Sequence, residues 1–244
     1  MTESEVLCGG FPVVCLGEAR DPSRWLRGYE QTYLERDVRE LSQVGDLVAF
    51  RNLLRLASLR TGQMLNVSEL GRDAKLNVTT TRRYLDVMEA SFVIMRLAPF
   101  LRNRASRLIK SPKMFVADSG LAAHLSGVTE IGPASDEPMR GALFETFVAH
   151  NLASILDARW PGARLYFWHV QGRHEVDFVI ESGRDVLAIE VKAGSAWSGS
   201  DLRALRVFLE VTPRCRAAVL AHNGDAAVQL GDRLWALPLS LVLS

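Results

Sequence analysis

From Glu175 to Lys192 the sequence reads EVDFVIESGRDVLAIEVK, and this stretch sets the architecture of the second half of the 244-residue chain. In its first half polar and apolar residues alternate, so that Asp177 falls on one face and Phe178 on the other, which is the period of a half-buried strand. The second half repeats the alternation. Between the halves, SGRD contains Gly183, which favours a tight turn. The stretch therefore predicts a β-hairpin.

A two-residue loop fixes the register of this hairpin, because Ser182 then faces Asp185 and, further along both strands, Asp177 faces Glu190. Opposed Cβ atoms of an antiparallel pair are about 5 Å apart, which is near enough for two carboxylates to share one divalent ion. Without a cation, like charges placed directly opposite destabilise a sheet. The carboxylate pair, with Lys192 two residues further on the same side, therefore points to a functional site.

An aspartate followed on the next strand by a glutamate and a lysine one residue apart resembles the signature of the PD-(D/E)XK, or restriction-endonuclease-like, nuclease superfamily. In that superfamily the acidic pair holds magnesium and the lysine orients or deprotonates the attacking water. The resemblance therefore implies Asp177 and Glu190 as ligands of Mg2+ (or Mn2+) and Lys192 as a catalytic residue. Charged residues at alternate positions also occur on exposed hairpins that carry no functional site. The rest of the sequence is therefore needed to distinguish the two interpretations.

The composition is that of a globular protein without a membrane span. Apolar residues make up 48% of the chain, which is ample for a core, and no run approaches the roughly 18 apolar residues of a membrane helix. The acidic start MTESE lacks the basic region of a secretory signal. Cys8, Cys15 and Cys215 form no CxxC pair, so neither a disulfide framework nor a zinc site is predicted. We expect a soluble cytoplasmic protein with no membrane partner.

Charge is distributed unevenly along the chain. Residues 1–50 carry five basic and nine acidic groups, residues 51–113 carry thirteen and four, and residues 114–244 carry eleven and fifteen. The segment nets are −4, +9 and −4, which sum to the overall +1. A middle segment this basic predicts a nucleic-acid-binding module. The alternative is a solvated basic face that contacts nothing.

Three short helices are predicted in and beside this basic segment, with Asp46, Asn66 and Asn77 as their N-caps. A tight turn before the third helix makes the set a helix-turn-helix. On the third helix Tyr84, Leu85 and Met88 face inward. Four residues of that helix face outward and are predicted to contact DNA: Thr79, Thr80, Arg82 and Arg83.

A basic wing is predicted after the third helix. Two strand-like runs, FVIMRLAP and KMFVAD, bracket the segment LRNRASRLIKSP and complete a winged helix. Outward Thr and Arg residues beside such a wing match the way these modules meet a major groove and phosphates. The predicted DNA contacts of the wing are Arg102, Arg104, Arg107 and Lys110. Winged helices also serve as spacers that dock proteins, so both readings stay open.

Three motifs resemble a bacterial and archaeal family of AAA-plus ATPases: CGGFP at Cys8 to Pro12, YLERDVREL at Tyr33 to Leu41 and SPKMFVADSGL at Ser111 to Leu121. In that family a phosphate-binding core precedes these motifs, so residues 1–45 resemble the end of a lid. No GxxxxGK[ST] occurs, so we assign no nucleotide-binding residue and expect no ATP hydrolysis by this chain alone. The resemblance implies a truncated or split member, with an ATPase partner chain as one possibility. We expect Asp118 to cap or turn the chain rather than to catalyse.

The second half of the chain begins after a linker rich in Gly and Pro at residues 127–138. A helix is predicted from about Met139 to Leu156, and its small residues Gly141 and Ala149 flank Glu145. Small neighbours let a helix approach a sheet closely. In the nuclease superfamily a glutamate on the first helix completes the metal site, and the resemblance gives Glu145 that role.

The elements predicted after this helix complete an αβββαβ order, the core of the nuclease superfamily. They are a strand at Leu165 to Val170, the hairpin, a helix at Asp201 to Glu210, a strand at Arg216 to Ala221 and a strand near Leu234 to Leu237. If the site is catalytically active, Glu145, Asp177 and Glu190 would bind magnesium, and the ion would lower the pKa of a bound water. Lys192 would steer that nucleophile.

Together these features predict a mixed α/β chain in which a winged helix-turn-helix precedes a restriction-endonuclease-like αβββαβ domain. The predicted domains are a lid remnant at 1–45, the winged helix at 46–126, the linker at 127–138 and the nuclease-like domain at 139–244. Two functions remain open. One is a divalent-metal-dependent DNA endonuclease with its own DNA reader. The other is a non-catalytic DNA- or partner-binding accessory of an ATPase, and a homo-oligomer is also open.

Overall fold

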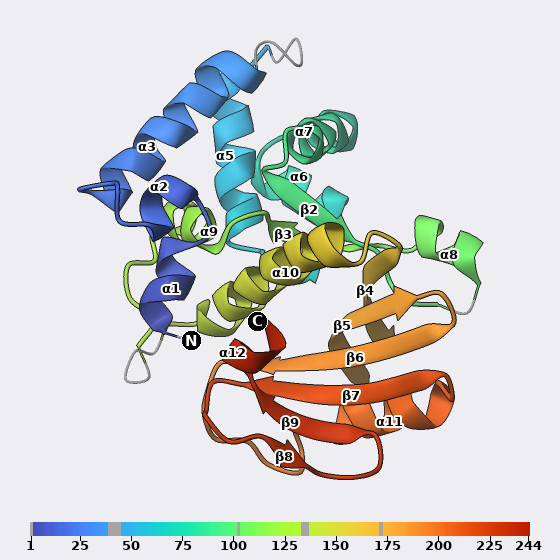
Figure 1. The fold of residues 1–244 in the computed structure, drawn as a ribbon. Helices are drawn as coiled ribbons and strands as arrows, with labels where there is room; N and C mark the ends of the chain where they lie inside the picture. Colours follow the sequence, from blue (N-terminus) through green and yellow to red (C-terminus); the bar gives the residue numbers. More distant parts are fainter. Residues whose placement is uncertain (1, 39–44, 102, 133–136, 171–172) are drawn as a thin grey trace. The chain divides into compact units, whose positions relative to one another are not determined.

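The chain folds as two compact units, and Figure 1 shows the order of their helices and strands. The computed structural model describes residues 2–38, 45–101, 103–132, 137–170 and 173–244. The N-terminal unit consists of residues 2–96 and 114–147, and the C-terminal unit of residues 97–113 and 148–244. The first unit is mainly helical with a small sheet, and the second contains a six-stranded mixed sheet, so the predicted mixed α/β class is confirmed. Among the described residues, no helix is long and apolar enough to cross a membrane.

The N-terminal unit consists of helices around a three-stranded sheet of order β1-β3-β2. Its helices are α1 (Glu3–Cys8), α2 (Pro12–Cys15), α3 (Pro22–Thr32), the π-helical turn η1 (Tyr33–Asp37), α5 (Leu47–Ser58), α6 (Val67–Asp73), α7 (Val78–Ala90) and α9 (Ser119–Ser126). Its strands are β1 (Gln63–Met64), β2 (Ile94–Leu97) and β3 (Lys113–Val116). The predicted caps are confirmed, because Asp46, Asn66 and Asn77 each accept backbone N–H bonds from the first turns of α5, α6 and α7.

Helices α6 and α7 lie close together on either side of a tight turn. A Cβ added to Gly71 of α6 would lie 2.5 Å from Oγ1 of Thr81 of α7, so the close approach requires glycine. The turn between them includes Lys75 in the left-handed region, with a φ of 56°. The inward-facing residues predicted for α7 are buried: Tyr84, Leu85 and Met88. Helices α6 and α7 are therefore closely packed, and the buried side of α7 is the predicted one.

Two of the sequence motifs meet at Asp118, which lies at the N-terminus of α9. Its carboxylate accepts N–H bonds from Leu121 of its own helix (2.7 Å) and from Gly10 of the CGGFP motif (2.6 Å). The prediction that Asp118 caps the chain is confirmed. One step further, a Cβ on Gly120 would lie 2.5 Å from the backbone oxygen of Cys8. The two motifs therefore approach each other backbone to backbone, which explains their glycines without any chemical role.

The C-terminal unit contains a six-stranded sheet of order β4-β5-β6-β7-β9-β8. Its strands are β4 (Ala163–Val170), β5 (His174–Ser182), β6 (Asp185–Lys192), β7 (Cys215–His222), β8 (Val228–Gln229) and β9 (Leu234–Pro238). Its helices are α8 (Arg104–Ile109), α11 (Arg203–Val211), α12 (Leu239–Val242) and the later part of α10 (Arg140–Arg159). Strand β6 pairs antiparallel with β5 and parallel with β7. Each element predicted after the linker is present, whereas α8, β8 and α12 were not predicted.

The predicted hairpin register is confirmed, since Ser182 pairs with Asp185 and Phe178 pairs with Ile189. The unbroken alternation predicted for β5 is wrong. Between the pairs Tyr166–Val179 and Trp168–Val176, one residue of β4 lies opposite two of β5, which is a β-bulge at Asp177 and Phe178. Val176 consequently belongs to the same buried cluster as Val179 instead of alternating with it. Both Phe178 and Val179 are fully buried, so the strand is not half-buried.

The predicted basic wing also needs correction. The segment between β2 and β3 forms helix α8, and its first part adds to the outer edge of β4, where the N–H of Phe100 donates to the oxygen of Phe167 at 2.5 Å. The ring of Phe100 packs against Phe208 of α11, which also contacts Trp168 edge to face at 5.2 Å. Apolar residues within the segment (Pro99, Phe100) thus attach it to the C-terminal unit.

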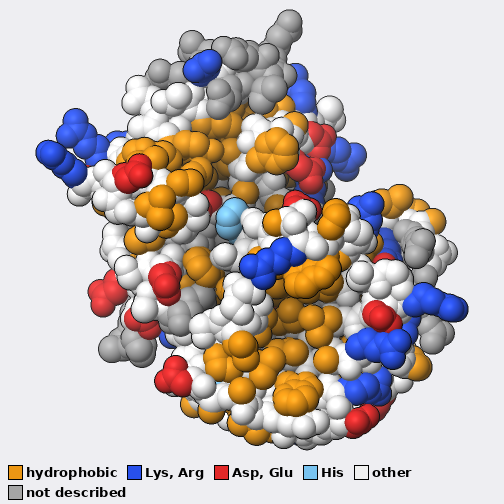
Figure 2. All heavy atoms as spheres, viewed as in Figure 1, with side chains coloured by type: hydrophobic (Ala, Val, Ile, Leu, Met, Phe, Trp, Pro, Cys, Tyr) orange, Lys and Arg blue, Asp and Glu red, His pale blue; other side chains and the backbone are white. Residues whose placement is uncertain are grey.

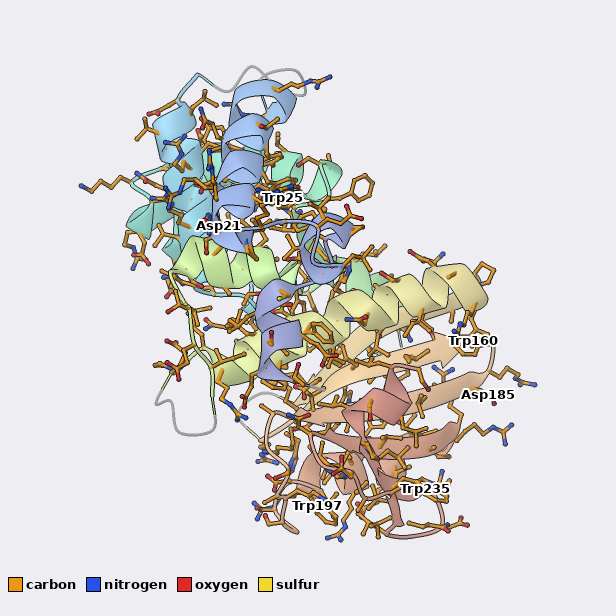
Figure 3. All side chains as sticks on the ribbon, turned by 60° about the vertical axis from the view of Figure 1, so that its left-hand side comes forward. Asp21, Trp25, Trp160, Asp185, Trp197 and Trp235 are labelled. Carbon is orange, nitrogen blue, oxygen red and sulfur yellow. The ribbon has the colours of Figure 1, made fainter. Side chains whose placement is uncertain are left out.

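The face of the C-terminal sheet opposite α11 is rich in apolar side chains. Figure 2 shows hydrophobic side chains gathered over β6, β7 and β9. Trp235 of β9, labelled in Figure 3, is partly exposed, and so are Leu187 of β6 and Leu237 of β9. Exposed apolar patches are common at surfaces that contact other molecules.

The backbone contact between the two motifs predicts the effect of a single methyl group. Gly120→Ala places its Cβ against the Cys8 backbone, which cannot move as a side chain would, so we expect a loss of about 1–3 kcal/mol in unfolding free energy. Gly28→Ala in α3 is the matched control, because nothing lies within 4 Å of its Cβ and alanine favours a helix by about 0.5–1 kcal/mol. Urea unfolding measures both. Equal stability of the two variants would contradict the close approach.

Candidate functional site

The bulge in β5 places the carboxylate of Asp177 in the protein interior, where only 6% of the residue is exposed. One oxygen, Oδ2, accepts the backbone N–H of Val191 on β6 at 2.8 Å. The other, Oδ1, lies 3.6 Å from the ammonium of Lys113. Burial raises the pKa of Asp177, and the charge of Lys113 and the Val191 N–H oppose this rise. The ionised form of Asp177 therefore depends on these partners.

Lys113, the first residue of β3, belongs to the C-terminal unit by its contacts. Its side chain is 3% exposed, and its ammonium forms ion pairs with Glu175 and Asp177. It also lies 5.9 Å from the centre of the Phe167 ring. A buried ammonium is costly unless it is paired, and two carboxylates of β5 supply the pairing here. The sequence did not predict this lysine as part of the site.

The predicted catalytic lysine lies beside the predicted carboxylates. Nζ of Lys192 forms an ion pair with Oδ1 of Asp201 at 2.8 Å. The pKa of Lys192 is raised, first by its hydrogen bond to Asp201 and further by the charges of Glu190 and Asp177. Lys192 is consequently protonated at neutral pH. Asp177 contacts the backbone of Val191, between Glu190 and Lys192, and Asp201, which was predicted only as the start of a helix, pairs with Lys192.

Glu145 occupies α10 in the N-terminal unit and is half-buried. Its Oε2 lies 3.3 Å from the position of a Cβ added to Gly62, at the turn before β1. Whether Glu145 joins Asp177 and Glu190 stays a prediction. Among the described residues, no group of three His, Cys, Asp or Glu side chains is arranged to hold a metal ion.

The carboxylates of Asp177 and Glu190 nevertheless fit a hard divalent cation. Mg2+ is commonly held by one or two protein carboxylates together with water and substrate phosphates. Asp177 is buried on β5 and accepts the N–H of Val191, which lies between Glu190 and Lys192 on β6, so the two carboxylates are carried by neighbouring strands. These two side chains would hold Mg2+ or Mn2+, with Lys113 as a neighbouring positive charge.

Arg107 needs correction as a predicted DNA contact. It is 5% exposed, and its Nη1 donates to Oε2 of Glu181 at 2.6 Å. The guanidinium carbon also lies 4.7 Å from the ring centre of Phe100 and 4.6 Å from that of Tyr166. Arg214 binds the same carboxylate. Since a guanidinium in this position faces protein on all these sides, Arg107 ties α8 to the sheet and is unavailable to a phosphate.

The remaining predicted DNA contacts are divided between the two units. In α7, Thr79, Arg82 and Arg83 are exposed and Thr80 is half-buried. Lys110 is exposed in the C-terminal unit. Arg102 lies outside the described residues. Arg104 is the first residue of α8, and its side chain also lies outside the described part.

Comparison with known proteins gives two family matches. Residues 2–131 match the family described as Domain of unknown function (DUF8612), and residues 140–242 match Domain of unknown function (DUF4143). Two proteins described as uncharacterized, Mb2031c of Mycobacterium bovis and Rv2008c of Mycobacterium tuberculosis, are each 31% identical over 239 residues, which is 98% of this chain and 53% of theirs. The chain thus spans about half the length of the curated relatives it matches. The crystal structure of protein VC1899 from Vibrio cholerae aligns with a TM-score of 0.27 and 13% identity, over 82% of this chain and 46% of that one.

The ion pairs of Glu181 predict a specific loss of stability in acid. Burial alone would raise the pKa of Glu181, but hydrogen bonds from Arg107 and Arg214 lower it below its ordinary value of 4.5. A lowered folded-state pKa contributes stability above the unfolded pKa, and this stability is lost as pH falls through the folded pKa. Wild type should therefore lose stability progressively below about pH 4.5.

Glu181→Gln should remove this part of the acid sensitivity and cost about 3–5 kcal/mol at pH 7, because it leaves the buried Arg107 without its counter-charge. Thermal unfolding from pH 3 to pH 8 measures both effects. Asp185→Asn is the control, because its ion pair with Arg216 is exposed and should change stability by less than about 1 kcal/mol. Parallel pH curves for wild type and Glu181→Gln would contradict the assignment.

Proposed function

We propose that this chain, which belongs to the family of the domain of unknown function DUF8612, binds DNA through helices α6 and α7. The observation that carries the proposal is the outer surface of α7, where Thr79, Arg82 and Arg83 are exposed just after the tight turn. Recognition helices of helix-turn-helix modules present the residues near their N-terminus to the major groove in this way. The helix-turn-helix assignment, without the predicted wing, and the resemblance to AAA-plus ATPases belong to this proposal.

The charges of α7 support the same proposal. Its acidic residues Asp86 and Glu89 are both paired with Arg96, at 2.8 and 3.1 Å. Within the described part of the chain, neither Arg82 nor Arg83 forms an ion pair, so their charges are available to phosphates. They lie in a segment with a net charge of +9, and such basic segments supply most non-specific DNA affinity.

The double variant Arg82→Ala/Arg83→Ala tests DNA binding. We expect affinity for duplex DNA to fall about tenfold or more, and the slope of log affinity against log salt to become shallower by about one for each lost phosphate contact. Fluorescence anisotropy with a labelled duplex at several salt concentrations measures both quantities. Arg20→Ala is the control, because Arg20 is an exposed arginine outside α6 and α7. A double variant that binds like Arg20→Ala would refute the proposed surface.

A second function is favoured by the hydrogen bond from Val191 to Asp177, because Val191 lies between Glu190 and Lys192 on β6. We propose divalent-metal-dependent hydrolysis of DNA phosphodiester bonds at this site, in line with the resemblance to PD-(D/E)XK nucleases. When bound, Mg2+ or Mn2+ would lower the pKa of a water molecule and polarise the phosphate. Lys192 stays protonated because Asp201 holds its ammonium, so it would orient a nucleophile or balance phosphate charge rather than act as a base.

Asp177→Ala separates this second function from a non-catalytic role. If the chain hydrolyses DNA, duplex, branched or single-stranded DNA incubated with Mn2+ is cut by wild type, and Asp177→Ala reduces the rate about 100-fold or more through loss of a metal ligand. Gel electrophoresis measures the cleavage. Cleavage that persists in Asp177→Ala would refute the assignment of Asp177 to the catalytic site. Without cleavage, the alternative of a DNA- or partner-binding accessory with a nuclease-like fold would stand.

Partners other than DNA remain proposals. An ATPase chain supplied in trans would fit the resemblance of residues 1–45 to a lid, and a homo-oligomer is also open. For either partner the chain offers the apolar face of the C-terminal sheet around Trp235.

A further inference from the structure

We propose that Lys113 is a built-in competitor for the divalent cation at Asp177, so that a metal ion binds there only by displacing the lysine ammonium. The inference deepens the second proposed function and rests on it for the identity of the ligand, a hard divalent cation. It concerns a residue 64 positions before Asp177 in the chain, which neither the hairpin signature nor the resemblance assigned to the site.

Both carboxylate oxygens of Asp177 already have a partner. Oδ2 accepts the Val191 N–H at 2.8 Å, and Oδ1 faces the Lys113 ammonium at 3.6 Å. A magnesium ion needs its ligand oxygen at about 2.0–2.1 Å in near-octahedral geometry. Oδ2 is held by the backbone of Val191 in β6, and Oδ1 is the oxygen that a cation would have to share with a positive charge. Lys113 is the group that holds it.

The charges lead to the same conclusion. A dication on Oδ1 and an ammonium 3.6 Å from that oxygen would be two neighbouring positive charges in a buried site, where screening by water is weak. The Lys113 side chain is 3% exposed, so it cannot relieve the repulsion by a small shift into solvent. Glu175 can keep the ammonium paired, because it already forms an ion pair with Lys113 and its own side chain is 39% exposed. Displaced from Asp177, the ammonium would stay with Glu175.

Removing the charge of Lys113 should therefore open the site. Lys113→Met keeps an unbranched chain of similar length in the buried position and leaves Asp177 and Glu175 without their ammonium. We expect the full chain with Lys113→Met to bind Mn2+ about tenfold or more tightly than wild type, since two adjacent charges of like sign no longer have to coexist. The electron paramagnetic resonance signal of free Mn2+ measures the bound fraction without reference to activity.

Two further variants locate the effect. Lys113→Met combined with Asp177→Asn should return Mn2+ affinity to the wild-type level or below, because the released carboxylate is gone. Lys110→Met, which removes an exposed lysine three residues earlier, should bind Mn2+ like wild type. The proposal is overturned if Lys113→Met binds Mn2+ no more tightly than wild type, or if its gain survives in the double variant.

Wild type provides a test that does not depend on the folding of a variant. Saturating Mn2+ should change the rate at which Lys113 is modified by mild reductive methylation, followed by mass spectrometry of its peptide, because the ammonium must leave Asp177. An unchanged rate in protein that has bound Mn2+ would overturn the proposal. If Lys113→Met binds Mn2+ tightly but neither wild type nor any variant cuts DNA, the hydrolysis proposal fails and the competition between Lys113 and the cation stands. If wild type cuts DNA and Lys113→Met binds Mn2+ no better than wild type, only the competition proposal fails.

Discussion

A buried carboxylate must be compensated, and the C-terminal unit is arranged around that constraint at Asp177. The β-bulge in β5 turns this side chain into the interior, where burial favours its neutral form. Its ionised form is supported by a backbone N–H of β6 and by the ammonium of Lys113. Lys113, β5 and β6, all in the C-terminal unit, are thus joined through one carboxylate.

The same rule governs the second charged cluster. Glu181 lies near the hairpin turn and holds Arg107 and Arg214 against the rings of Phe100 and Tyr166. This cluster fixes α8 to the sheet, so residues that the sequence placed in a DNA-binding wing became part of the C-terminal unit. Of these two clusters, the one around Asp177 contacts the strand that carries the proposed catalytic lysine, Lys192. The other is accounted for by its contacts within the fold.

Local patterns predicted much of the fold. The alternation and the glycine of SGRD gave the hairpin and its register, and short polar residues before apolar runs gave the caps at Asp46, Asn66 and Asn77. These features depend on residues a few positions apart. The bulge at Asp177 was missed because it is set by pairing with β4, which the alternation of β5 alone does not show. The pairing of Lys113 with Asp177 and of Arg107 with Glu181 joins residues 64 and 74 positions apart, and no local signal carries it.

Anomalous scattering from crystals soaked in Mn2+ would show whether Asp177 exchanges its lysine partner for a divalent ion. We expect a manganese peak at Asp177, with the Lys113 ammonium moved from Asp177 toward Glu175. A manganese ion at Asp177 with Lys113 still 3.6 Å from Oδ1 would contradict it, as would a saturated crystal whose manganese lies elsewhere while Asp177 and Lys113 keep their present contact.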